Sequence, residues 1–148
     1  MPDLVVRGDA LDIAIEDGKI VAVGPELAGA SHELDARGLH ILPGLIDVHL
    51  HFNEPGRTEW EGAATGSRAL AAGGGTLFFD MPLNSTPCTV NAAAFDQKRA
   101  ALAESSITDF ALWGGLVPGN SGELADLAVQ QLGVPSRTRN LAFCGHPA

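Results

Sequence analysis

The chain has 148 residues, a formal net charge of −9 and a pI near 4.8. This length is sufficient for a compact fold that buries most of its apolar surface. Nine Lys and Arg residues stand against eighteen Asp and Glu residues, which excludes a nucleic-acid partner because phosphate binding needs a basic face. The uncharged run 110–122 is too short, and too interrupted by proline and glycine, to cross a membrane.

The cysteine content and the N-terminus both favour the cytoplasm. Cys88 and Cys144 are far apart in the sequence and do not make a disulfide framework, which indicates a reducing compartment. Charged residues within the first twelve positions interrupt the apolar stretch that an export signal needs. We therefore expect a cytoplasmic protein whose partner is a small polar molecule.

Residues 1–43 predict a small all-β module of the β-sandwich type. The apolar residues Ile13 and Ile15 alternate along the chain before Asp17 and Gly18, which form a strong two-residue hairpin signal. The apolar run 20–23 follows directly and supplies the second strand of the hairpin.

Residues 44–133 alternate short apolar runs with helical stretches, which is typical of strand–helix units around a parallel sheet. The expected strands are 45–50, 76–80 and 110–113, and the expected helices are 58–72, 91–104 and 120–132. The pattern therefore predicts an α/β fold of about three strand–helix units.

Two of these helices carry start signals. Thr58 and Glu61 have the spacing of a capping box, with Trp60 expected on the buried face of the first helix. Asn120, with Glu123 three residues later, marks the start of the third helix. The aromatic residues Phe78, Phe79 and Trp113 are expected in the core.

The strand–helix pattern stops near residue 133. The tail, residues 134–148, contains two arginines and no acidic residue, although the rest of the chain is strongly acidic. An ordinary frayed terminus would explain this tail. An out-of-frame or alternatively spliced end is the second explanation.

The strongest chemical signal is a histidine pair at the end of the first strand after residue 43. Because side chains alternate along a strand, His49 and His51 are expected on the same face, where two imidazoles can reach one divalent cation. Two surface histidines on an edge strand, or a small metal-binding β-module, would give the same spacing. The apolar strand and the Pro-Gly turns on either side of it favour a metal site, and Asp47 is expected to support it.

Four blocks of sequence carry a family resemblance. The run 42–51 resembles the first barrel strand of the amidohydrolase superfamily, and the runs 52–62, 80–87 and 113–120 resemble the allantoinases. The resemblance implies a partial TIM (β/α) barrel in residues 44–133 and a hydrolase that opens allantoin to allantoate in purine breakdown. It also implies two divalent metals, usually zinc, and a homo-oligomer.

The substrate is indicated by residues beside the histidines. Dihydroorotases typically carry an arginine two residues after the second histidine, where it grips a carboxylate, and this chain has Asn53 there. Asn84 matches a family position that contacts the substrate ring, although an asparagine between prolines is also an ordinary turn former. A cyclic amide such as allantoin is therefore expected, with dihydroorotase and dihydropyrimidinase or hydantoinase activities as alternatives.

Other parts of the family's site are missing from the sequence. The resemblance places a bridging lysine on the strand after the third helix, and a catalytic aspartate later still, but residues 134–148 contain neither. A full barrel needs roughly 250 residues. We therefore expect an incomplete and inactive fragment of the family, with no catalytic residue of its own. A noncatalytic binding or interaction module is the alternative from another class.

Overall fold

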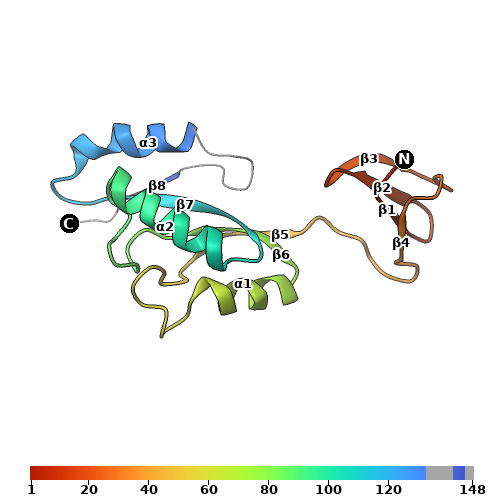
Figure 1. Ribbon diagram of the computed structural model, residues 1–148, viewed down its shortest axis with the longest axis horizontal. Helices are drawn as coiled ribbons and strands as arrows, with labels where there is room; N and C mark the ends of the chain where they lie inside the picture. The colour runs from red at the N-terminus through yellow and green to blue at the C-terminus, as the bar shows by residue number, and fades with distance from the viewer. Residues whose placement is uncertain (133–141, 146–148) are drawn as a thin grey trace. The chain divides into compact units, whose positions relative to one another are not determined.

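The computed structural model describes residues 1–132 and 142–145, and the chain divides into two compact units (Figure 1). The first unit comprises Met1–Pro43 and the second Gly44–Ala148. Among the described residues, no helix has the length and apolar character needed to cross a membrane.

The first unit is one four-stranded sheet. Its strands are β1 (Leu4–Arg7), β2 (Asp12–Glu16), β3 (Lys19–Gly24) and β4 (His32–Asp35), in the order β3-β2-β1-β4. The β2–β3 hairpin turns at Asp17 and Gly18, both with positive φ, as the sequence predicted. The expectation of a sandwich is wrong for this unit, because most residues of β3 are exposed and no second sheet within Met1–Pro43 covers them.

The second unit is a parallel sheet with helices between successive strands. The strands are β5 (Leu45–Leu50), β6 (Gly75–Asp80), β7 (Asp109–Leu116) and β8 (Ala142–Gly145), paired in that order. The helices are α1 (Ala63–Ala72), α2 (Ala92–Ser105) and α3 (Leu124–Leu132), with a 3-10 turn, η1 (Ser121–Glu123), before α3. Helix α1 packs beside β6, and α2 and α3 pack beside β7 (Figure 1). The three predicted strand–helix units are confirmed.

A fourth strand departs from the sequence-based expectation. We predicted that the pattern would stop near residue 133, but β8 pairs in parallel with β7, from Trp113 opposite Ala142 to Leu116 opposite Gly145. Four residues are too short a run to show periodicity, and the unpaired edge of β7 provides the hydrogen-bonding groups that extend the sheet. The rest of the predicted foreign tail lies outside the described residues.

The core of the second unit is built on three phenylalanine rings in contact, one pair edge-to-face and one pair stacked. Phe78 on β6 is fully buried, and its ring centroid lies 4.7 Å from that of Phe52 and 6.0 Å from that of Phe110. The predicted core position of Phe78 is therefore confirmed, whereas Phe79 and Trp113 are only half-buried, with ring centroids 5.9 Å apart. The Phe52 ring attaches the loop after β5 to the sheet.

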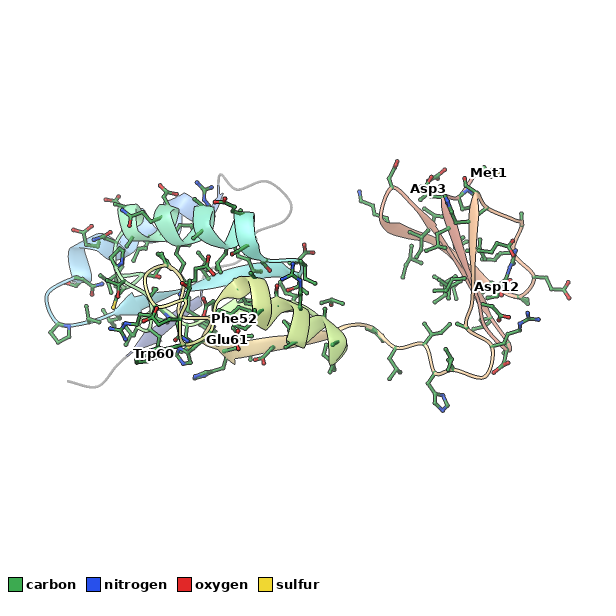
Figure 2. The ribbon with its side chains drawn as sticks, turned by 60° about the horizontal axis from the view of Figure 1, so that its bottom comes forward. Met1, Asp3, Asp12, Phe52, Trp60 and Glu61 are labelled. Atoms are coloured by element: carbon green, nitrogen blue, oxygen red, sulfur yellow. The ribbon has the colours of Figure 1, made fainter. Side chains whose placement is uncertain are left out.

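The first helix starts later than predicted. The expected capping box is wrong: residues 58–60 form a turn, and α1 begins at Ala63. The backbone N–H of Ala63 donates to Glu54 Oε2 at 2.7 Å, so the carboxylate that caps the helix comes from the preceding loop. Trp60 precedes the helix and is 68% exposed, and Figure 2 labels it beside Glu61 in this loop.

Helices α2 and α3 begin in different ways. Asn91 caps α2 as a side-chain acceptor for the N–H of Ala94, at 2.9 Å. Asn120 does not cap α3: its Oδ1 accepts the N–H of Val117, and its Nδ2 donates to the carbonyls of Val90 and Gly115. Asn120 therefore secures the loop after β7, and η1 begins the helical segment instead.

Candidate metal centre

The histidine pair lies at the carboxyl end of β5. His49 is in the strand and His51 follows its last residue, and both side chains are exposed. The pairing with β6 is irregular here, since Asp47 lies opposite Phe78 and Leu50 opposite Asp80. One extra residue of β5 therefore bulges out around Val48 and His49. The two rings still come together, with centroids 5.6 Å apart and planes at 72°.

The spacing of the rings suits a shared cation. Zinc–nitrogen distances near 2.1 Å and a tetrahedral angle would put the centroids of two imidazole ligands roughly 5 Å apart. The observed 5.6 Å lies close to that value. Among residues 1–132 and 142–145, however, no group of three or more His, Cys, Asp or Glu side chains could hold a metal ion. His49 and His51 are thus two of the ligands that such a site would need.

Three hydrogen bonds fix the end of β5 near the histidines. The carboxylate of Asp47 accepts the backbone N–H of His49 at 3.0 Å, which agrees with its expected supporting role. The indole Nε1–H of Trp113 donates to the carbonyl of Val48 at 2.9 Å. The N–H of Met81 donates to the carbonyl of Leu50, also at 2.9 Å. The bulged strand is therefore held by β6 and β7 as well as by its own aspartate.

A buried ion pair, which the sequence analysis missed, lies behind the histidines. Asp80 at the end of β6 and Lys98 on α2 are 0% and 1% exposed, and Lys98 Nζ lies 3.1 Å from Asp80 Oδ2. Burial raises the pKa of Asp80 and lowers that of Lys98, and each partner's charge opposes the shift. Lys98 lies between Phe95 and Leu102 on the buried face of α2, so its helical spacing was the available signal.

The ion pair also influences the second histidine. Burial is the main cause that lowers the pKa of His51, and the positive charge of Lys98 acts in the same direction. The negative charge of Asp80 opposes this shift. The charges of Asp80 and Lys98 therefore act electrostatically on the imidazole of His51.

The two asparagines expected to bind substrate lie in neighbouring loops. Asn53 is 8% exposed with φ of 57°, and its Oδ1 is buried without a hydrogen-bond partner among the described residues. Asn84 is half-buried in the loop after β6. The N–H of Thr86 donates to the carbonyl of Pro55 at 2.8 Å, so the structure joins these loops beside the histidine pair.

The model of the amidohydrolase family matches residues 40–135, which is more than half of the chain. The chain belongs to the amidohydrolase family. This amidohydrolase chain is 69% identical over 137 residues to the allantoinase of Solibacter usitatus (strain Ellin6076), covering 86% of the chain and 30% of that protein. It is 56% identical over 135 residues to the allantoinase of Rubrobacter xylanophilus, covering 85% of the chain and 30% of that protein.

Solved structures agree with this family assignment. The L-hydantoinase (dihydropyrimidinase) from Arthrobacter aurescens matches with a TM-score of 0.78 and 30% identity, covering 87% of this chain and 31% of that one. A D-hydantoinase from Thermus sp. matches with a TM-score of 0.70 at 22% identity, covering 85% and 31%, and that likeness concerns the fold. The amidohydrolase chain thus spans about 30% of the length of the relatives that it matches.

Proposed function

We propose that this chain forms the first part of a metal-dependent cyclic amidohydrolase that opens the ring of allantoin to give allantoate. The observation that carries the proposal is the pair of imidazoles, 5.6 Å apart, at the carboxyl end of β5. The allantoinases that are 69% and 56% identical to the chain support this choice of substrate. On this proposal, β5 to β8 and their helices are the first units of a (β/α)₈ barrel, whose active sites lie at the carboxyl ends of the strands.

The histidine pair would hold a divalent cation, which we take to be zinc. When bound, such a cation would supply a water nucleophile near neutral pH and would polarise the carbonyl of the ring amide. His49 and His51 would bind it, while Asp47 and Trp113 hold the strand that carries them. Two protein ligands are fewer than the three that catalytic zinc sites normally use. The remaining ligands would have to come from outside the described residues.

Asn53 and Asn84 are proposed to face the substrate. The Asn53 Oδ1 atom meets no donor among the described residues and could accept an N–H group of a ligand, but it is buried, so the side chain would have to turn outward to reach one. Asn84 is half-buried and retains accessible surface in the neighbouring loop. Neither residue offers the bidentate cationic fork that suits a carboxylate, which makes dihydroorotate the less suitable substrate.

A hydantoin is the second candidate substrate, favoured by the TM-score of 0.78 to an L-hydantoinase at 30% identity. Hydantoin and allantoin share the five-membered ring with two amide groups, so the same cation and asparagines would serve both.

We also infer a cytoplasmic protein, since Cys88 is a free, half-buried thiol and the sequence has two cysteines in all.

A chimera tests the proposal. Residues 1–133 of this chain would replace the matching part of the Solibacter usitatus allantoinase, and hydrolysis of allantoin, hydantoin and dihydroorotate would be measured. We expect allantoin to be the preferred substrate and His49→Ala or His51→Ala to reduce the rate at least 10³-fold, by roughly 4 kcal/mol of lost transition-state stabilisation. His40→Ala, an exposed histidine of the first unit, is the matched control and should leave the rate unchanged.

The other outcomes separate the alternatives. Preference for hydantoin over allantoin would reassign the substrate but keep the metal-dependent reaction. A folded chimera that hydrolyses none of the three compounds would exclude the hydrolase proposal and leave the noncatalytic interaction module.

A further inference from the structure

The two residues that flank His51 are both bonded to the end of β6. On one side, the carbonyl of Leu50 accepts the N–H of Met81 at 2.9 Å. On the other side, the N–H of Phe52 donates to Asp80 Oδ1 at 3.2 Å. The backbone is therefore fixed on both sides of His51. A main-chain hydrogen bond holds the residue before it, and a hydrogen bond to the Asp80 side chain holds the residue after it. Only the second of these depends on which amino acid stands at position 80.

Asp80 is held in place by the lysine behind it. Its Oδ2 and Lys98 Nζ meet as charges at 3.1 Å, without the alignment of a hydrogen bond. Lys98 Nζ is itself fixed, because it donates to the carbonyl of Met81 at 2.7 Å and lies 3.5 Å from Ser85 Oγ. The ammonium group thus orients the carboxylate and, through Met81, the residue whose N–H bonds to Leu50.

Stabilisation of the fold does not by itself explain the Asp80–Lys98 ion pair. Both side chains are at least 99% buried, and a fully buried ion pair loses hydration that its Coulomb attraction barely repays. Apolar residues of similar volume often replace such pairs at no cost in stability. Its role should therefore be sought in the group that it fixes, and that group is the N–H that follows His51.

We propose that Asp80 is a positioning residue that fixes the backbone of His51 through the N–H of Phe52 and so sets the geometry of the histidine pair. This inference rests on the proposed metal-binding role of that pair. In this arrangement Asp80 binds no metal or substrate itself. It acts through the peptide N–H of Phe52, and the buried phenylalanine ring transmits the constraint to the core.

Two double variants of the 148-residue chain separate positioning from stability. Asp80→Asn/Lys98→Met removes both charges and keeps a side-chain oxygen to accept the N–H of Phe52. Asp80→Leu/Lys98→Met removes both charges as well, but its side chain is the same size as asparagine and has no acceptor. Circular dichroism and urea unfolding establish that both variants are folded. The two variants then differ only in whether the side chain at position 80 can accept the hydrogen bond from the N–H of Phe52.

Two measurements report on that acceptor: hydrogen exchange of the Phe52 amide, and Zn²⁺ affinity by calorimetry. We expect the asparagine variant to protect the amide and bind Zn²⁺ within about twofold of the unmodified chain. The leucine variant should lose the protection and bind roughly 10- to 100-fold more weakly, the usual cost of removing a support behind a metal ligand. Equal protection, or equal affinity, in the two variants would overturn the proposal.

Two further variants keep the test decisive. If neither double variant folds, Asp80→Glu retains the charge opposite Lys98 but moves the acceptor by one methylene; exchange and affinity unchanged from the unmodified chain would then refute positioning. If His49→Ala/His51→Ala binds Zn²⁺ as well as the unmodified chain, the proposed metal site fails. In that case the exchange rate of the Phe52 amide alone decides whether Asp80 positions the strand.

Discussion

Gly66 on α1 is the residue at which the helix comes closest to the loop after β5. A β-carbon at this position would lie 2.3 Å from Cε1 of Phe52, and backbone hydrogen bonds of the helix leave little room to move. The absence of a side chain therefore allows the Phe52 ring to pack between α1 and Phe78. A single glycine thus determines how the loop that follows the histidines is seated.

Gly66→Ala should destabilise the second unit by about 1–3 kcal/mol, because the added methyl group overpacks the core. Urea unfolding followed by circular dichroism measures the change. Gly122→Ala is the matched control, since nothing lies within 4 Å of its β-carbon position, and it should shift the free energy of unfolding by less than about 0.5 kcal/mol. Equal effects of the two substitutions would contradict the packing argument.

In the first unit, Arg7 is the residue that joins several strands through its side chain. Its guanidinium donates to Asp12 Oδ2 at 2.7 Å and to Glu33, joining β1 to β2 and β4. These hydrogen bonds lower the pKa of both carboxyl groups. The stability that they contribute is present above the unfolded pKa values, near 4, and is lost as the pH falls through the lower folded values.

We therefore expect hydrogen-exchange protection of the Val5 amide to fall between pH 4 and pH 2. Arg7→Met should flatten this dependence by removing the cause of both pKa shifts. Arg68→Met, at an exposed position of α1 in the other unit, serves as the control and should leave the profile of Val5 intact. A profile that Arg7→Met does not alter would show that other groups govern the acid response.

Among the helices, the start of α1 shows that local sequence rules do not predict a cap that comes from a distant residue. The sequence predicted β5, β6, α2 and the histidine pair, because periodicity and the alternation of side chains along a strand are properties of neighbouring residues. The capping box at Thr58 failed because Glu54, nine residues before Ala63, supplies the carboxylate instead. The Asp80–Lys98 pair was missed for the same reason, since its partners are 18 residues apart and meet only through packing.

Glu54 links two helices and the loop of the site. Besides capping α1, its Oε1 accepts the hydroxyl of Ser105 at the end of α2, at 3.0 Å. Glu54→Ala should therefore destabilise the second unit by about 1–3 kcal/mol, the cost of losing a cap and a charged hydrogen bond. Thermal unfolding checks this, with Glu59→Ala at an exposed loop position as control. Equal melting temperatures of these variants would refute the link.

In the second unit as a whole, β5 is the outer strand of the described sheet. Leu45, Ile46 and Val48 on this strand are 65%, 57% and 56% exposed, and a groove of about 530 Å³ runs between the strand and α1. An apolar edge with free hydrogen-bonding groups favours pairing with another chain. No local sequence pattern distinguishes an edge strand from an inner one.

The chain should accordingly self-associate as its concentration rises, and Ile46→Lys should reduce this by placing a charge on the edge. Light scattering at increasing concentration measures the effect. Leu11→Lys adds the same charge at an exposed site of the first unit, 52% exposed, and should change association little. If both lysines reduce association equally, net charge rather than the β5 edge is responsible.

The hydrogen bond from Trp113 to the bulge in β5 gives the protein an optical reporter of its own. The indole lies one peptide unit from His49, whereas the second tryptophan, Trp60, is 68% exposed in the loop before α1. With Trp60→Phe, the fluorescence would come from Trp113 alone. Any movement of the bulge, whether caused by a cation or by a substitution at Asp80, would then change the emission of a single, half-buried fluorophore bonded to the bulge.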